Sequence, residues 1–270
     1  AKELGGHTTS PLIESAAKRF GIDLQEVTLT GDGASLLDEP RPAHFVGMAP
    51  FVLEGAPKPK STSKPEAHAA PLANAKLAMD GHGDEAAWAT AKPVAWTTDW
   101  SGDDTGIRTQ ARFLWSAQAL YALFELEGAH LNVDTSKPTD EERLKLYAED
   151  CVEMFLDPTP GSPKSYFELE VGPFGHFFDL ALDGKKSDLA WSAGLSIGTS
   201  HDDKAHTATI ELAIGSKDVT KALTADARLP FALYRMEGKG KRKYLAWSPT
   251  RTKTPNFHVP EAFGALVLDR

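Results

Sequence analysis

The feature that most constrains the fold is a series of short strand-like runs between residues 108 and 268, with few stretches long enough for a helix. Clusters of Gly, Pro or Asp separate many of these runs. Strands in series without long intervening helices favour antiparallel pairing in two packed sheets. The sequence therefore predicts an all-β fold, an antiparallel two-sheet β-sandwich. The predicted strands are Arg108–Trp115, Gln118–Glu125, Cys151–Asp157, Tyr166–Val171, His176–Leu182, Leu189–Ile197, Ala205–Ile214, Leu229–Arg235, Lys243–Ser248 and Ala265–Leu268.

The first quarter of the chain has a different composition and is predicted to be an N-terminal extension. Ser10–Gly21 has a serine N-cap, a proline in the first turn and a terminal glycine, which indicates one short helix. Residues 55–74 are rich in proline and poor in bulky apolar side chains, which is typical of a linker or of a strap across a surface. We therefore expect an arm at 1–54, a linker or strap at 55–74 and the sandwich domain at 75–270.

Two helical segments are expected inside the sandwich domain. Thr139–Glu149 begins with a threonine cap and carries Leu144, Leu146 and Tyr147 as a partial apolar face. A short helical turn is expected to aim Trp88 back at the core.

Composition excludes several classes of protein. Acidic residues outnumber basic ones 38 to 29, for a net charge of −9, which disfavours a nucleic-acid partner. Cys151 is the single cysteine, so an intrachain disulfide and a cysteine-based zinc cluster are excluded. No apolar run approaches the length of a transmembrane segment, about 18 residues. The first residues do not form a signal peptide, although a leader can have been removed before them.

The chain lacks the common catalytic motifs. GxSxG, HExxH and phosphate-loop patterns are absent, which favours a non-catalytic protein. Glu153 with Glu168 or Glu170 leaves a glycosidase open as an alternative, because that chemistry needs two facing carboxyl groups. A haem-binding sandwich with Met154 as a ligand is a further alternative, but core packing explains that methionine better.

Short motifs in a fixed order point to a family. They are MDGHGDEAAW at Met79–Trp88, LYALFE at Leu120–Glu125, EDCVEMFLDP at Glu149–Pro158, YFELEVGPFG at Tyr166–Gly175, TATIELAI at Thr207–Ile214, and LYR, YLAWSP and NFHVPEAFG in the last forty residues. This order resembles the family 9 carbohydrate-binding modules and the broad group of bacterial domains like them, over about Ala75 to Arg270. The resemblance implies a jelly-roll-like β-sandwich, sugar binding, and calcium in some members. It also implies an exported bacterial envelope protein, located extracellularly, in the periplasm or on the cell surface.

The end of the chain concentrates planar and hydrogen-bonding side chains, which suit a flat, polar ligand such as a sugar ring. Strand alternation places Glu153 between Cys151 and Phe155, and places Arg235 on the side of Phe231 and Leu233. Two interpretations of Glu153 and Arg235 remain open: they pair as a structural ion pair, or both bind a ligand's hydroxyl groups.

The predicted binding site also uses two indoles. Trp100 lies in a polar loop with Trp96, and Trp100 facing Trp247 would make a slot with two walls for a pyranose ring. The candidate ligand-binding residues are Trp100, Trp247, Glu153, Arg235, Asn256 and His258.

Calcium is the one metal that the loops suggest. Asp99, Asp103 and Asp104 are the candidate ligands in an oxygen-rich loop, and residues 132–140 form a second such loop. Neither loop matches an EF-hand pattern, and acidic loops are commonly just solvated.

The sequence thus predicts a non-catalytic module that binds a polysaccharide or another glycan. The alternative is an envelope scaffolding or adhesion domain with a protein partner. A sugar site needs an exposed indole beside polar groups, whereas a protein-binding surface needs a wider apolar patch.

Overall fold

The computed structural model describes residues 3–4, 7–8, 64–73, 76–159 and 165–270, and every structural statement below concerns these residues. The chain divides into two compact units, Ala1–Thr62 and Ser63–Arg270. In the first unit, strands β1 (Glu3–Leu4) and β2 (His7–Thr8) pair antiparallel. The predicted helix Ser10–Gly21 lies outside the described residues.

The second unit consists mostly of β-strands, which confirms the predicted all-β class. Its strands are β3 (Glu66–Pro71), β4 (Val94–Thr98), β5 (Asp104–Trp115), β6 (Leu120–Glu127), β7 (Cys151–Leu156), β8 (Ser165–Val171), β9 (Phe177–Asp183), β10 (Lys186–Asp188), β11 (Leu195–Asp202), β12 (Thr207–Ile214), β13 (Arg228–Glu237), β14 (Lys243–Ala246) and β15 (Gly264–Leu268). Its helical segments are short: the 3-10 turns η2 (Ala86–Thr90), η3 (Leu146–Ala148) and η4 (Pro260–Ala262), and the α-helix α2 (Lys217–Thr220).

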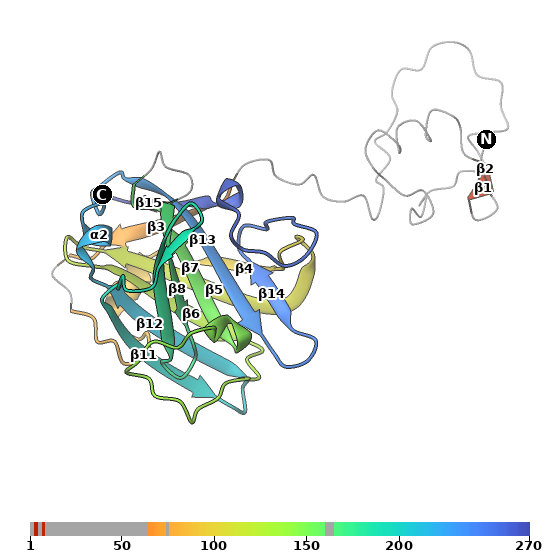
Figure 1. The fold of residues 1–270 in the computed structure, drawn as a ribbon, viewed down its shortest axis with the longest axis horizontal. Helices are drawn as coiled ribbons and strands as arrows, with labels where there is room; N and C mark the ends of the chain where they lie inside the picture. The colour runs from red at the N-terminus through yellow and green to blue at the C-terminus, as the bar shows by residue number, and fades with distance from the viewer. Residues whose placement is uncertain (1–2, 5–6, 9–63, 74–75, 160–164) are drawn as a thin grey trace, which may run out of the picture. The chain divides into compact units, whose positions relative to one another are not determined.

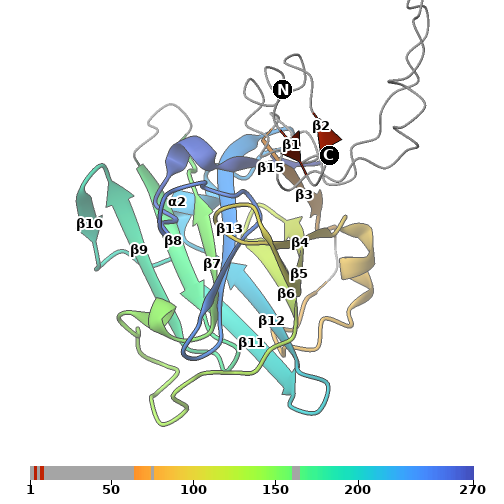
Figure 2. The same cartoon turned by 90° about the vertical axis from the view of Figure 1, so that its right-hand side faces the viewer.

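Hydrogen bonds connect these strands into one path that folds over into two layers. The order is β10-β9-β8-β7-β13-β15-β3-β5-β6-β12-β11, with β14 paired to β13 and β4 paired to β5. Figure 1 and Figure 2 show β7, β8 and β9 in one layer and β5, β6, β11 and β12 in the other. The layers pack through a main core, in which the rings of Phe113 and Phe231 lie 5.3 Å apart at right angles. The predicted sandwich is confirmed, and its described strands pair antiparallel except at β15–β3 and β3–β5.

Strand β3 lies inside the 55–74 segment that the proline content predicts to be a linker or strap. It pairs in parallel with β15 on one side and with β5 on the other. Ala67 and Ala69 are fully buried in the main core. Hydrogen bonds along both edges hold this strand, so its lack of bulky side chains does not exclude it from the sheet. The sandwich therefore begins before Ala75.

The predicted helix Thr139–Glu149 is wrong. Only η3 is helical there, and Lys145 just before it has a left-handed backbone with φ 65°. Leu144 is 67% exposed and Tyr147 is 50% exposed, so Leu146 is the one residue of the predicted apolar face that reaches a core. Most of the stability of a protein helix comes from packing its apolar face, and this segment lacks that packing.

Helix α2 is capped by Ser216, whose Oγ accepts a hydrogen bond from the amide of Val219 at 3.3 Å. No helix in the described part of the chain has both the length and the apolar character needed to cross a membrane.

Strand β7 buries both of its faces. Met154 faces the main core together with its neighbours two positions away on either side. Glu153 faces the opposite way, between Cys151 and Phe155, as the alternation predicts. This second buried face therefore carries a buried acidic side chain among apolar ones.

Replacing Gly198 in β11 is expected to destabilise the domain. A Cβ added at Gly198 would lie 2.3 Å from the backbone carbonyl carbon of Met79, so the turn at 79–83 would have to move away from β11. Gly198→Ala should therefore lower the free energy of unfolding by roughly 1–3 kcal/mol in urea denaturation. Gly215→Ala is the matched control, because its nearest atom would lie at 3.6 Å. Equal losses in the two variants would contradict this account.

Candidate functional site

A second apolar cluster lies on the side of the β8–β7–β13 layer that faces away from the main core. We call it the outer-face cluster, and its buried members are Leu146, Cys151, Phe155, Tyr166, Phe178, Leu180, Ala232, Tyr234, Met236, Ala246, Phe257 and Phe263. The loop before β15 closes over it. Phe257 stacks on Tyr234 with ring centroids 4.0 Å apart, and Phe263 lies edge-on to Tyr166 at 5.2 Å. This loop is therefore part of the same face.

Three glutamates are buried beside these rings. Glu153 of β7 lies directly opposite Glu170 of β8, and Glu168 shares the face of Glu170 two residues earlier. All three are at most 5% exposed. Burial raises the pKa of Glu168 to about 7. Burial also raises the pKa of Glu153 and of Glu170, and repulsion from the neighbouring glutamates adds to the effect. The site thus favours the protonated form of these carboxyl groups.

His258 lies at the rim of this cluster. Its Nδ1 is 2.8 Å from the hydroxyl of Tyr166, its Nε2 is 3.9 Å from a carboxylate oxygen of Glu168, and its side chain is half exposed. A cavity of about 400 Å³ lies beside Tyr166. Its lining includes Lys64, Asp157, Tyr166, Arg228, Glu261 and Phe263.

Trp100 and Tyr244 form a partly exposed ring pair at the edge of the same face. Their centroids are 6.2 Å apart at an interplanar angle of 86°. The indole N–H of Trp100 donates to the carbonyl of Thr252 at 3.2 Å, and the amide of Arg251 donates to the carbonyl of Trp100 at 2.7 Å. These bonds fix the ring pair against the loop 249–258.

The structure brings four of the six predicted ligand-binding residues to this face. Glu153 and His258 belong to it directly, and Trp100 packs against its edge. Asn256 is exposed in the loop, where its Oδ1 accepts a hydrogen bond from the amide of His258 at 3.1 Å. Of these four, only Glu153 is buried.

Trp247 lies on the opposite face, in the main core. It is 9% exposed and lies edge-on to Phe231 with centroids 6.0 Å apart. Tyr244 and Trp100 pack against the outer-face cluster instead. The predicted slot between Trp100 and Trp247 is therefore not formed, because the two indoles are on different sides of the layer.

Arg235 also faces the main core and does not pair with Glu153. In the β13–β7 register, Arg235 lies opposite Val152, whereas Tyr234 lies opposite Glu153. Directly opposed residues share a face, so Arg235 and Glu153 point to opposite sides of the sheet. Arg235 is 1% exposed and donates to Glu237 at 2.5 Å. The predicted ion pair between Glu153 and Arg235 is therefore wrong, and Arg235 pairs with Glu237 instead.

The predicted calcium ligands lie in a turn that its own hydrogen bonds close. Asp99 Oδ1 accepts from the amides of Ser101, Gly102 and Asp103 and from the hydroxyl of Ser101. Asp104 Oδ1 accepts from the amide two residues later, and this bond lowers the pKa of Asp104. The calcium site stays a prediction, and these contacts explain the turn without an ion.

Sequence reasoning misses the rings that shape the face. Tyr166, Tyr244 and Phe257 are not among the candidates that it selects. Tyr166 alternates with Glu168 and Glu170 along β8, just as Cys151 and Phe155 flank Glu153 on β7. That shared alternation of aromatic and acidic residues is the signal that could have identified both strands.

Comparison with known proteins identifies the family and similar folds. The profile of the family described as carbohydrate family 9 binding domain-like matches residues 79–270. No curated protein matches the chain. A structure from Bacteroides uniformis, of a protein proposed to bind carbohydrate, has a TM-score of 0.61 at 14% identity, covering 77% of this chain and 100% of its own.

Two structures of a family 9 carbohydrate-binding module from Caldicellulosiruptor kristjanssonii are also similar. One is a complex with glucose and the other with cellotriose, and each has a TM-score of 0.55 at 16% identity. Each match covers 76% of this chain. It also covers 97% of the chain in the glucose complex and 94% of the chain in the cellotriose complex. These likenesses show the fold, and the profile match extends over more than half of the sequence. The chain belongs to the carbohydrate family 9 binding domain-like family.

Proposed function

We propose that this domain binds a carbohydrate without catalysis, at the Trp100–Tyr244 ring pair and the adjoining loop 249–258. Membership of a family of carbohydrate-binding domains supports the class of ligand. The glucose and cellotriose complexes of the similar module make glucose-based sugars the first ligands to test. The observation that carries the location is the partly exposed indole of Trp100, held in a fixed orientation beside exposed polar side chains.

The chemistry of this edge suits a sugar ring. The apolar C–H face of a pyranose stacks on an indole, while its hydroxyl groups need oriented donors and acceptors. Arg251 and Asn256 are exposed in the loop and can supply such groups. Stacking with a few hydrogen bonds gives modest affinity, because most of the contact energy offsets the cost of association.

The buried carboxyl groups support binding rather than hydrolysis. A glycosidase places two carboxyl groups on either side of the bond that it cleaves. Glu153 and Glu170 are 4% and 1% exposed beneath the outer-face cluster, so they do not reach a sugar bound at the surface.

Exposed apolar residues give less support to the scaffolding alternative. Among the described residues, the large apolar side chains that are exposed are Leu144, Tyr147 and Leu189. A protein-binding surface is usually a contiguous apolar patch of several hundred Å². Three such residues in two separate segments favour the sugar ligand over a protein partner.

The proposal predicts that Trp100→Ala weakens sugar binding. Calorimetric titration of the wild type with cellotriose and with glucose should give binding, and the variant should lose at least about 10-fold in affinity, since ~1.4 kcal/mol corresponds to that factor. Trp191→Ala is the matched control. Its indole is also partly exposed, but it stacks on Phe167 at 4.0 Å, away from the proposed site.

Two outcomes would overturn the proposal. If the wild type binds neither these sugars nor any glycan on an array, the carbohydrate function is wrong and the scaffolding alternative takes its place. If Trp100→Ala binds as tightly as the wild type while remaining folded by circular dichroism, the domain binds sugar elsewhere. The cavity beside Tyr166 is then the next site to test.

A further inference from the structure

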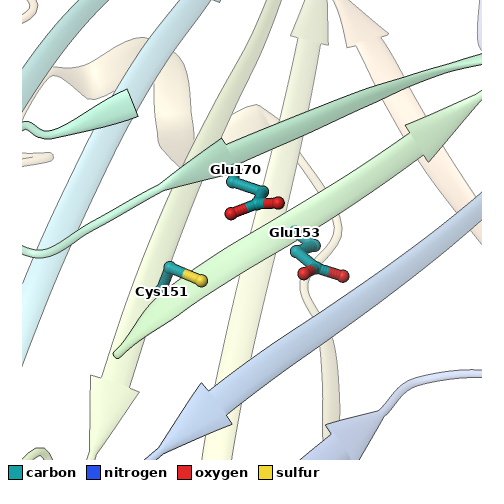
Figure 3. Close-up of side chains that lie close together, drawn as sticks. All are labelled: Cys151, Glu153 and Glu170. Atoms are coloured by element: carbon teal, nitrogen blue, oxygen red, sulfur yellow. The ribbon is translucent and has the colours of Figure 1, made fainter. Parts of the chain in front are cut away.

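The outer-face cluster contains a thiol and two carboxyl groups packed against one another. Cys151 and Glu153 are two residues apart on β7, and Glu170 lies opposite Glu153 on β8 (Figure 3). Their ligand atoms, one sulfur and two oxygens, all lie within 4.8 Å of one another, and the residues are at most 4% exposed. We propose that Cys151, Glu153 and Glu170 bind a thiophilic divalent cation of the zinc and cadmium type. The sugar site proposed above is separate and does not enter this inference.

The ionised form of this cluster is unfavourable without a positive partner. Two glutamates directly opposite each other on neighbouring strands repel when ionised. Glu170 is 1% exposed, and neither of its carboxylate oxygens has a well-oriented hydrogen bond. A buried polar group of this kind normally has a partner, because it otherwise loses its bonds to water. Glu170 therefore lies in the cluster without a well-oriented donor, and its polar neighbours are the amide of Tyr147 and the carboxyl group of Glu168.

The positive charge of Arg242 acts on this cluster, but one positive charge does not balance the three acidic groups. Its charge stabilises the ionised forms of Cys151 and Glu153. Its guanidinium, however, donates to the backbone carbonyl of Glu149 at 2.5 Å. If the thiol and both carboxyl groups ionise, their three negative charges are balanced by one divalent ion together with Arg242. With a divalent ion bound, the buried cluster becomes electrically neutral.

The donor set selects the kind of ion. Thiolate sulfur is a soft ligand that favours zinc and related ions, whereas calcium and magnesium take oxygen ligands almost exclusively. In a tetrahedral zinc site the bond lengths are about 2.3 Å to sulfur and about 2.1 Å to oxygen, which puts ligand atoms roughly 3.3–3.8 Å apart. Separations within 4.8 Å therefore need to shorten by at most about 1.5 Å for the three side chains to bind one ion. Water or Glu168, on the same face, can take the fourth position.

Cadmium titration of the full chain tests the site directly. Cys151 is the single cysteine, so an ultraviolet thiolate-to-cadmium absorption band can come only from this site. After treatment with a chelator, the protein should bind one equivalent of Cd²⁺ with this band, and Zn²⁺ in large excess should compete with it and reduce the band. Binding must also release protons and tighten as the pH rises, because the thiol and carboxyl groups ionise. The melting temperature should rise with metal concentration.

The variants separate metal binding from a structural role. Cys151→Ala should abolish the band and the metal-dependent rise in melting temperature, and Glu170→Gln should weaken binding by at least about 10-fold. Glu141→Gln changes an exposed carboxyl group outside the cluster and should leave both readouts unchanged. Because the site is buried, each titration is repeated with Cd²⁺ added during refolding, so that slow entry cannot hide binding. If the wild type shows no band and no stabilisation under either condition, or if Glu170→Gln binds like the wild type, the proposal is wrong.

Discussion

Replacing Arg235 with methionine is expected to lower the free energy of unfolding by roughly 3–5 kcal/mol, because it leaves a buried carboxylate without its cation. Arg235 is 1% exposed and Glu237 is 3% exposed. Arg235 also donates to the carbonyl of Glu127 at 3.0 Å and to the hydroxyl of Thr109 at 3.3 Å. The guanidinium thus ties β13 to strands β5 and β6 of the facing layer. Urea denaturation of the wild type and of Arg235→Met measures the loss.

The double variant Arg235→Met/Glu237→Leu is the control for this interpretation. Replacing a buried ion pair by apolar residues of similar size is often nearly neutral, whereas removing one partner is costly. The double variant should therefore recover most of the lost stability. A different result, in which Arg235→Met keeps its stability and loses affinity for sugar, would assign Arg235 to ligand binding after all.

The metal-free domain is expected to lose stability as the pH rises from 5 to 8. In the unfolded chain, glutamates lose their protons near the usual pKa of about 4.3. In the folded chain, burial raises the pKa of Glu168 to about 7 and also raises the pKa of Glu153 and Glu170. Between the unfolded and folded pKa values the folded state holds more protons than the unfolded state, so a rise in pH favours unfolding. A tenfold difference in proton affinity between the two states corresponds to about 1.4 kcal/mol. The rise in the pKa of Glu168 from about 4.3 to about 7 alone therefore makes the expected loss on the order of 3 kcal/mol.

Chemical denaturation in the presence of a chelator, at several pH values, checks this dependence. Glu170→Gln should flatten it, because an amide has no proton to release and Glu153 no longer lies opposite a second carboxyl group that raises its pKa. At pH 8 this variant should be more stable than the wild type. Glu141→Gln, which changes an exposed carboxyl group, should follow the wild type throughout. If the Glu170→Gln and wild-type curves are parallel, the glutamate cluster does not control the pH response.

Alternation along a strand is predictable from the sequence, but the register between strands is not. The positions that flank Glu153 on β7 are assigned to the correct face from the period of two alone. Pairing Glu153 with Arg235 needs the register of β13 against β7, and the register follows from loops and packing of the whole sheet. A shift by one position exchanges the faces, which is why a correct alternation still leads to a wrong ion pair.

The features that the sequence analysis predicts wrongly share one physical cause. The burial of a residue depends on neighbours that are distant in the sequence. Trp96 is expected in a polar loop with Trp100, but strand β4 places it in the main core at 5% exposure. No local feature of the sequence indicates that β5 lies beside β4 with this face inward. In the same way, the 139–149 segment has helix-forming residues but lacks a surface to pack against. The partial exposure of Trp100 is predictable, because its polar loop does keep the indole in contact with solvent.

The parallel insertion of β3 has a consequence for how the domain is made. Its partners β15 and β5 come from opposite ends of the domain sequence, and the β15–β3 ladder joins residues about 200 positions apart, such as Glu66 and Ala265. Closing so long a loop is entropically costly and slow. During synthesis, β3 emerges first and must wait for β15 before the sheet is complete. We therefore expect nascent chains that end before Gly264 to expose an unpaired strand edge and to need protection from aggregation.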